Sequence, residues 1–284
     1  MLPRVGWLGV EQQKWNRGDF VDVEAHHVLP ILIGGGSRAV NAPQCFVGGR
    51  IFMTLLDRLL IQTCVKLFQL GDPVLEIGSH QLKEGGNPYQ DLRPFFPGRK
   101  YIGSDFSPGP GVDCAADATS LGIRERTVGT VVMVSTIEHV FRVFDAFEEI
   151  SRVLAAHGAV VVTSHMDCGI HAYPSDYWRF TPEAFARLLD NFPAKIVGYQ
   201  GLSYNPFVVF GIGFKEVPEN FDQLAARFRR ELEQSMNTTK GALPMKHKMS
   251  RMRRLFLWRL FGSKDSFRKL RDEYVIGWHS QVTH

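Results

Sequence analysis

The segment Pro73-Val74-Leu75-Glu76-Ile77-Gly78-Ser79 constrains the fold of this chain more than any other. Its short apolar run follows Gly71-Asp72 and stops at Gly78, which is typical of a central strand in a parallel sheet. A glycine at the strand end permits a sharp turn and a close approach of a ligand to the backbone. In open α/β sheets, ligands bind at the carboxyl ends of the strands, beside the point where the strand order reverses. The segment therefore predicts a ligand site at the end of this strand.

A second strand end of the same kind follows at Tyr101-Ile102-Gly103-Ser104-Asp105. Asp105 lies 29 positions after Glu76, about the length of one βαβ unit. An acid at that spacing can accept hydrogen bonds from the two hydroxyls of a ribose. The two strand ends together predict that the ligand is a nucleoside cofactor.

Alternating strand and helix patterns predict an α/β fold, namely a Rossmann-like, doubly wound and mostly parallel seven-stranded sheet. We expect an irregular N-terminal cover over residues 1–50, the sheet-containing core over 51–216, and a helical, basic C-terminal extension over 217–284. The strands are expected at 74–77, 100–104, 112–115, 130–134, 159–163, 194–198 and 207–214. Helices are expected at 51–70, at 138–156, from the N-cap Thr181 to about Leu189, and after Asn220. In the helix over 138–156, apolar spacing predicts Val140, Phe144, Phe147, Ile150 and Leu154 on the buried face.

Charge is distributed unevenly along the chain. Residues 246–271 contain ten Lys or Arg and one acid, Asp265, whereas the whole chain has a net charge of +4. Such a segment is usually a solvated face, and binding to an anionic surface or an acidic partner is the functional alternative. No apolar run approaches the length of a transmembrane helix, and the N-terminus lacks a signal-peptide core. Four scattered cysteines without a Cys-x-x-Cys motif indicate free thiols and a cytoplasmic location.

The order of these parts resembles the class I S-adenosylmethionine-dependent methyltransferases, and in particular small bacterial methyltransferases of the type 11 kind. The resemblance covers roughly residues 51–215. It is carried by 74–79, 101–105, Asp113 to Asp117, Ile137-Glu138-His139-Val140, Arg152-Val153-Leu154 with Gly158, and 171–182. It implies that S-adenosyl-L-methionine is the cofactor.

The resemblance also implies roles for individual residues. Glu76 and Gly78, with Ser79 and His80 in the following loop, would lie against the methionine part of the cofactor. Asp105 would bind the ribose hydroxyls, Phe106 would flank the adenine, and Asp117 with the backbone of Ala118 would contact the adenine edge. Ser135 and Thr136 would line the methyl-donor pocket. Asp117 within Asp-Ala-Thr is also typical of a turn residue.

The sequence departs from the family pattern in two turns. The usual Gly-x-Gly loop is Gly78-Ser79-His80-Gln81 here, so either His80 projects toward the cofactor or the loop takes a different path. The usual Pro-Gly-Gly turn before the fifth strand is Ala156-His157-Gly158-Ala159.

Catalytic residues are expected after the fourth and fifth strands. Methyl transfer needs a lone pair on the acceptor, and a histidine can remove the acceptor's proton near neutral pH. His165 or His171, oriented by Asp176, is the predicted base. His139 either serves as a base or substrate contact, or bonds a backbone carbonyl. The group His165, Asp167, Cys168 and His171 matches no zinc template, so we predict no metal site.

These observations predict a cytoplasmic biosynthetic enzyme that methylates an oxygen or nitrogen of a small-molecule acceptor. Nucleic acid is not the expected substrate, because Ser135-Thr136-Ile137-Glu138 stands where base-modifying enzymes carry Asn/Asp-Pro-Pro-aromatic. The main alternative is a non-catalytic protein of the same fold that docks to a partner through its basic C-terminal segment. A nicotinamide-dependent oxidoreductase is a weaker alternative, because the chain lacks Gly-x-Gly-x-x-Gly at this strand end.

Overall fold

The computed structural model describes residues 54–81, 91–171, 175–242, 256, 268, 272 and 274–279. The predicted N-terminal cover at 1–50 and nearly all of the basic segment at 246–271 lie outside the described residues.

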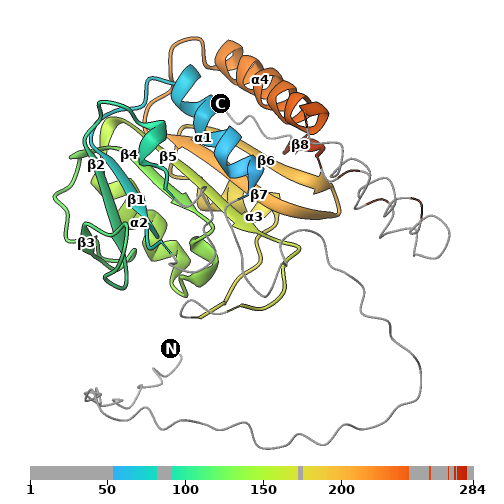
Figure 1. Cartoon of the computed structure of the whole chain (residues 1–284). Coiled ribbons are helices and arrows are strands. Elements are labelled where there is room, and N and C mark those ends of the chain that lie inside the picture. Colours follow the sequence, from blue (N-terminus) through green and yellow to red (C-terminus); the bar gives the residue numbers. More distant parts are fainter. Residues whose placement is uncertain are drawn as a thin grey trace, which may run out of the picture. The chain divides into compact units, whose positions relative to one another are not determined.

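A single mixed sheet forms the centre of the described chain (Figure 1). Its strands are β1 (Val74–Ile77), β2 (Tyr101–Asp105), β3 (Cys114–Ala115), β4 (Val128–Val134), β5 (Leu154–His165), β6 (Ala194–Leu202), β7 (Asn205–Phe214) and β8 (Ile276–Trp278). The order across the sheet is β3-β2-β1-β4-β5-β7-β6-β8. The pairs from β3 through β5 are parallel, whereas β7 is antiparallel to both β5 and β6, and β8 is antiparallel to β6.

The predicted doubly wound α/β fold is confirmed, with one more strand than the seven expected. The added strand, β8, has three residues and pairs with β6 through Gly198, Tyr199 and Gln200. Its sequence is too short to signal a strand by itself. It becomes one because Trp278 packs against Phe210 and Phe228 from other elements.

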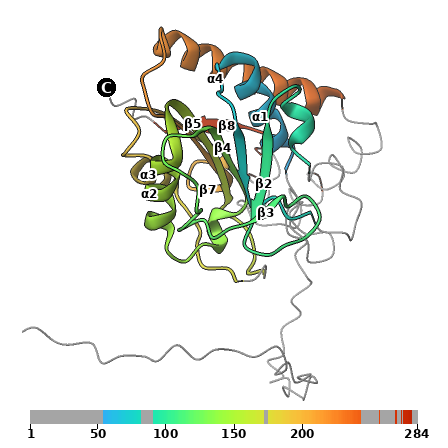
Figure 2. The same ribbon diagram turned by 90° about the vertical axis from the view of Figure 1, so that its left-hand side faces the viewer.

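Helices cover the sheet on both faces (Figure 2). Within each strand, successive side chains alternate between the two layers. Val74, Val132 and Val161 face the cluster that contains α1 (Leu55–Leu67) and α4 (Phe221–Ala242). Leu75, Met133 and Val162 face the cluster that contains α2 (Val143–Val153) and α3 (Pro182–Leu188). Strands buried on both faces explain the uninterrupted apolar runs of the sequence.

Local signals fix the starts of α1 and α3. Thr54 caps α1, and its hydroxyl accepts from the Asp57 amide while the Asp57 carboxylate accepts from the Thr54 amide, forming a capping box. Thr181 caps α3, with Pro182 at the first turn as predicted. The start of α3 agrees with the prediction, whereas α1 runs from Leu55 to Leu67 instead of over the expected 51–70.

The predicted helix over 138–156 is wrong at both ends. A short 3₁₀ turn, η2 (Ile137–His139), precedes α2, and β5 begins directly at Leu154. The buried face of α2 is formed by Val143, Ala146, Phe147, Ile150 and Val153. Phe144, which the apolar spacing places on the buried face, is 67% exposed because Val143 instead of Phe144 faces the core in that turn.

Cysteine and membrane predictions agree with the described part of the chain. Cys64, Cys114 and Cys168 form no disulfide there, as the cysteine pattern predicts, and Cys45 lies outside the described residues. Within the same part of the chain, no helix combines the length and the apolar character needed to cross a bilayer.

Candidate active site at the ends of the parallel strands

The carboxyl ends of β1 and β4 lie side by side at the point where the strand order reverses, and the residue after β1 contacts a side chain that follows β4. Gly78 follows β1 with a φ of +89°, and a Cβ built on it would lie 2.0 Å from the Thr136 hydroxyl. Only glycine fits at this position, both for its conformation and for its space. Ser135, a residue with a Cβ, also has a positive φ of 48°. Such strain in a non-glycine residue is characteristic of functional sites.

Two hydroxyl groups at this point are buried without a hydrogen-bond partner. They are Ser79 Oγ, one residue after Gly78, and Ser135 Oγ, directly after β4. Buried polar atoms are nearly always paired in folded proteins, so unpaired ones mark a place where a ligand is expected to bind. Two orphaned hydroxyls beside a backbone that tolerates no Cβ fit a polar cofactor placed over the end of β1.

Glu76 is buried near the end of β1, with 5% of its surface exposed. Its Oε2 accepts a 2.7 Å hydrogen bond from the Tyr101 hydroxyl on β2. Burial raises the pKa of this carboxyl to about 7, against the lowering effects of the Tyr101 hydrogen bond and of nearby Arg93. The carboxyl is therefore held in an environment that disfavours its charge, and a cationic ligand group would relieve that penalty.

The loop after β1 follows its own path and is fastened to the segment after β2. The Gln81 amide donates to the Pro110 carbonyl at 2.8 Å, and the amides of Gly78 and Ser79 both donate to the Ser104 carbonyl. A Cβ on Gly109 would lie 2.3 Å from the His80 ring, so this ring packs against the β2 loop. The sequence left two alternatives for this loop: His80 projects toward the cofactor, or the loop takes a different path. The packing of His80 agrees with the different path.

Asp105 stands at the end of β2 and joins the same loops. Its carboxylate accepts from the Ser107 amide at 3.0 Å and from the His80 amide at 3.4 Å. The neighbouring Phe106 is 68% exposed, so its ring is available to cover a ligand.

Asp117 and Ala118 follow β3, the strand next to β2 at the edge of the sheet. The Asp117 carboxylate accepts from both the amide and the hydroxyl of Thr119 at 2.8 Å, which is the turn geometry anticipated for Asp-Ala-Thr. The Ala118 side chain is buried in the core cluster on the α2 face. The Asp117 carboxylate therefore holds a turn in the structure.

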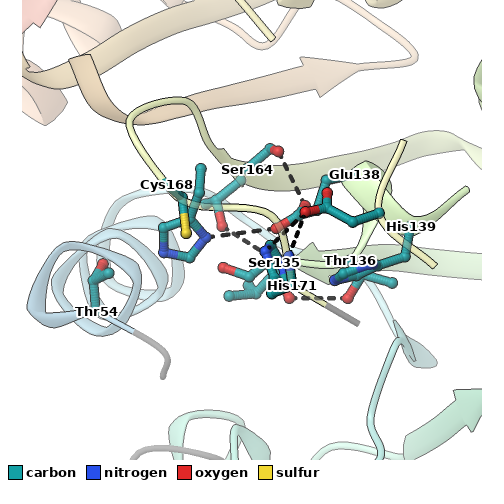
Figure 3. A network of polar contacts seen from close by, with 12 residues as sticks. Thr54, Ser135, Thr136, Glu138, His139, Ser164, Cys168 and His171 are labelled. Atoms are coloured by element: carbon teal, nitrogen blue, oxygen red, sulfur yellow. Dashed lines mark hydrogen bonds and ion pairs between the residues drawn. The ribbon is translucent and has the colours of Figure 1, made fainter. Parts of the chain in front are cut away.

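A fully buried polar cluster lies between η2 and the end of β5. Glu138 Oε2 accepts from the Ser164 hydroxyl at 3.0 Å, and Glu138 Oε1 lies 3.5 Å from His165 Nδ1 (Figure 3). Burial alone would raise the pKa of Glu138, but the contact with His165 outweighs it and leaves the pKa below its ordinary value. Burial would likewise lower the pKa of His165, but Glu138 raises it above its ordinary value. Both pKa directions favour the charged forms of this pair, and neither side chain is exposed.

His139 and His171 come together from different segments, with ring centroids 4.8 Å apart in an edge-to-face arrangement. His139 Nδ1 lies 2.6 Å from the Ser175 carbonyl oxygen. His171 Nδ1 lies 3.0 Å from both the Gly169 carbonyl oxygen and Asp176 Oδ2. Carbonyl and carboxylate oxygens only accept, so each Nδ1 carries a proton and any lone pair of the ring lies on Nε2.

Asp176 anchors this arrangement. Arg179 donates to both of its carboxylate oxygens, at 2.5 and 2.6 Å, and the His171 amide donates to it at 2.9 Å. The hydrogen bonds from Arg179 lower the pKa of Asp176 to about 2, against the effect of burial. The predicted pairing of His171 with Asp176 is therefore present, and Asp176 also holds the loop that Arg179 crosses.

The four predicted catalytic residues lie in two groups, and a fifth residue, Glu138, joins them without having been singled out by the sequence. The structure groups His139, His171 and Asp176 on one side, while His165 lies fully buried against Glu138. The backbone carbonyl of Glu138 also accepts from the amides of Tyr177 and Trp178, which ties η2 to the later loop. The sequence signal that could have singled out Glu138 is its position as an acid shortly after an apolar strand and next to His139.

Comparisons with known proteins agree with this architecture. Residues 93–162 match the family model described as a methyltransferase domain. One similar solved structure is an S-adenosylmethionine-dependent methyltransferase of Thermotoga maritima, with 17% identity, 57% of this chain and 92% of that chain covered, and a TM-score of 0.39. Another is an S-adenosylmethionine-dependent methyltransferase of Archaeoglobus fulgidus, with 14% identity, 55% of this chain and 94% of that chain covered, and a TM-score of 0.41. A third, the methyltransferase CalH, was solved with S-adenosylhomocysteine; it has 14% identity, with 55% of this chain and 54% of that chain covered and a TM-score of 0.40. No curated protein matches the chain.

The sheet with its reversal between β1 and β4, and the orphaned polar groups at that point, define a doubly wound α/β protein with a candidate ligand site at the strand ends. The match over 93–162 is to a methyltransferase domain. The resemblance to methyltransferases predicted from the sequence is thereby confirmed over those residues.

Proposed function

We propose that the protein transfers the methyl group of S-adenosylmethionine to an oxygen or nitrogen of a small-molecule acceptor. The observation that carries this proposal is the strained, polar junction of β1 and β4, where Ser79 Oγ and Ser135 Oγ are buried without partners beside Gly78. When bound, the cofactor supplies a methyl group on a sulfonium, which is intrinsically reactive. The chain's own contribution is then to hold, orient and dehydrate the reactants.

The cofactor-binding residues follow from the strand ends. Glu76, Gly78, Ser79 and His80 would hold the methionine part, where the buried Glu76 carboxylate suits an ammonium group. Asp105 and Phe106 would hold the ribose and cover the base, and Asp117 with Ala118 would border the adenine. Ser135 and Thr136 would line the space next to the methyl donor.

The acceptor side would be formed by η2, by the end of β5 and by the loop that carries His171 and Asp176. Nε2 of His171 and of His139 each keep a lone pair there, because Nδ1 of each ring is committed to an oxygen acceptor. Either Nε2 can take a proton from an acceptor hydroxyl or ammonium. Asp176 would orient His171 through the 3.0 Å contact to Nδ1. His165, being fully buried, would act by fixing Glu138.

The domain assignment remains part of the proposal. Residues 51–216 would form the catalytic core, residues 1–50 together with the loop around 164–180 would cover the acceptor, and 217–284 would extend the core. A cytoplasmic location and a small-molecule acceptor fit this organisation.

Cofactor binding is tested by thermal unfolding and calorimetry with S-adenosylmethionine, S-adenosylhomocysteine and nicotinamide dinucleotides in turn. A ligand at about 100 times its dissociation constant adds about 2.7 kcal/mol, a shift of a few degrees in Tm. The Asp105→Asn variant keeps the acceptor for the Ser107 amide and should bind the first two ligands at least tenfold more weakly. Asp145→Asn on α2 is the matched control and should bind normally.

Turnover is then measured as S-adenosylhomocysteine formation with a panel of hydroxyl, phenol, amine and carboxylate acceptors. Formation that depends on one acceptor class supports the proposal. Cofactor binding without turnover on the whole panel would favour the alternative of a non-catalytic protein that docks to a partner through residues 246–271. A Tm shift with nicotinamide dinucleotides alone would overturn the proposal.

A further inference from the structure

The acceptor side of the site contains three potential metal ligands that the sequence does not bring together. One donor atom from each of Glu138, His139 and His171 lies within 4.8 Å of the donor atoms of the other two. Glu138 and His139 are neighbours in η2, whereas His171 follows 33 positions after Glu138, beyond the end of β5. That distance in sequence, with no fixed spacing, explains why no zinc template matches.

Two of the three donors are buried and have no hydrogen-bond partner. Neither Glu138 Oε1 nor His171 Nε2 takes part in a hydrogen bond, and the side chains are 0% and 7% exposed. The polar neighbour of Oε1 is His165 Nδ1 at 3.5 Å, so Oε1 keeps lone pairs for a ligand, and the buried His171 nitrogen is costly unless a ligand satisfies it. A cation satisfies both at once, whereas a hydrogen-bond donor would have to be shared between them.

The surrounding groups hold the ligands in the form that a metal requires. His139 Nδ1–H points to the Ser175 carbonyl, and His171 Nδ1–H points to Asp176 and the Gly169 carbonyl. Metal-bound histidines typically donate their second ring N–H to a carbonyl or carboxylate, which fixes the tautomer with the free nitrogen toward the ion. Ser164 holds the other oxygen of Glu138 at 3.0 Å. Each ligand thus already has the outer partner expected of it.

We propose that Glu138, His139 and His171 bind a divalent transition-metal ion, with Zn²⁺ as the first probe. Two imidazoles and one carboxylate suit Zn²⁺, Co²⁺, Mn²⁺ or Fe²⁺ and disfavour Mg²⁺ and Ca²⁺, which prefer all-oxygen sites. Zinc distances of about 2.1 Å in a tetrahedron would put donor atoms about 3.4 Å apart. Binding therefore requires the donor atoms, which now lie within 4.8 Å of one another, to move closer together.

Three protein ligands leave at least one coordination position open, as in catalytic rather than structural sites. The open position would take a hydroxyl or carboxylate oxygen of the methyl acceptor, a role that rests on the proposed function. An oxygen bound to the ion ionises at a lower pH, so the ion would take the place of an imidazole as the means of activating the acceptor. The acceptor class favoured by this site is therefore an oxygen nucleophile.

Metal binding is tested on the full-length protein, stripped with chelator and dialysed, by titration with Co²⁺ and Zn²⁺. We expect one equivalent of Co²⁺ to bind with the visible absorption of a four- or five-coordinate ion, and Zn²⁺ to displace it. His171→Ala and Glu138→Gln should weaken binding at least tenfold. His157→Ala, which removes an exposed histidine paired with Glu216, is the matched control and should bind like the parent.

Glu138→Gln changes a buried ion pair, so His171→Ala, in a loop, is the decisive variant if the former unfolds. S-adenosylhomocysteine affinity, measured in the same metal-free samples, separates the two proposals. Normal cofactor binding with no saturable Co²⁺ site, or with a site that both variants retain, overturns the metal proposal alone. Failure of the parent protein to bind the cofactor would instead overturn the proposed function.

Discussion

Replacing Glu76 with Gln should stabilise the protein at neutral pH and weaken cofactor binding. The pKa of Glu76 is raised by burial from 4.5 to about 7 in the folded state. Between these two pH values the folded chain keeps a proton that the unfolded chain has lost. The free energy of unfolding therefore falls as pH rises from about 4.5 to about 7, and it is unaffected by this group outside that window.

The size of the effect follows from the pKa difference. At 1.36 kcal/mol per pKa unit, a rise from 4.5 to about 7 corresponds to about 3 kcal/mol of stability lost when the buried carboxyl ionises. Gln cannot ionise, and its side-chain oxygen can still accept the hydrogen bond from the Tyr101 hydroxyl. We expect Glu76→Gln to unfold like the parent at pH 4.5 and to be about 2–3 kcal/mol more stable at pH 7.5.

The assay is urea denaturation of the cofactor-free parent and variant at pH 4.5, 5.5, 6.5 and 7.5. The difference between the two proteins is the readout, because all other groups titrate in both. Glu148→Gln, at an exposed position of α2, serves as the control and should show no pH-dependent difference. Parallel pH profiles for the parent and Glu76→Gln would refute the reasoning. The variant should also lose most of its Tm shift with S-adenosylhomocysteine, as expected where a site sacrifices stability for function.

Three further variants test other parts of the structure. Gly78→Ala should lower the free energy of unfolding, measured by urea denaturation, by roughly 1–3 kcal/mol, because φ is positive at this position and the new Cβ clashes with Thr136. Adding Thr136→Ala should recover only the part of the loss that is due to the clash. Asp176→Asn should lower the free energy of unfolding by about 2 kcal/mol at pH 7, because the pKa of Asp176 is about 2 in the folded protein and 3.8 in the unfolded chain. This contribution is lost as pH falls from about 4 toward 2, so a difference from the parent that persists at pH 2 would contradict the argument. Phe228→Ala should cost about 3–5 kcal/mol in one cooperative transition, since its ring packs between Phe68 and Trp278. Phe144→Ala, at an exposed ring, should stay within about 0.5 kcal/mol of the parent, and an equal loss in both would contradict the burial pattern.

The strands and the candidate ligand site at their ends could be located from the sequence because their signals are local. The run from Val74 to Gly78 encodes burial on both faces, a strand end and a close backbone approach within a few residues. The same holds for Asp105 at the end of β2 and for the capped start of α3. Each of these features depends on neighbours in sequence, so the chain alone contains enough information to place them.

The start of α2 and the strand β8 depend on tertiary contacts and could not be predicted. The apolar periodicity of α2 continues back to Val140, but residues 137–139 form a 3₁₀ turn because the Glu138 carbonyl is bound by the Tyr177 and Trp178 amides instead of closing a helical turn. The segment 276–278 is a strand because β6 offers it an edge and Phe210 and Phe228 receive Trp278. Neither contact has a signature in its own sequence.

The two halves of the site are therefore specified in different ways, and this difference bears on function. The proposed cofactor half is built from strand ends whose positions the sheet fixes directly. The proposed acceptor half depends on η2 meeting the loop around His171 and Asp176, which is held by the Arg179 clamp and by the bonds to the Glu138 carbonyl. Changes in that loop can alter the acceptor without disturbing the sheet, which is how one fold serves many reactions. Acceptor specificity is thus expected to respond to substitutions at 167–180, and cofactor affinity to substitutions at 76–80 and 105.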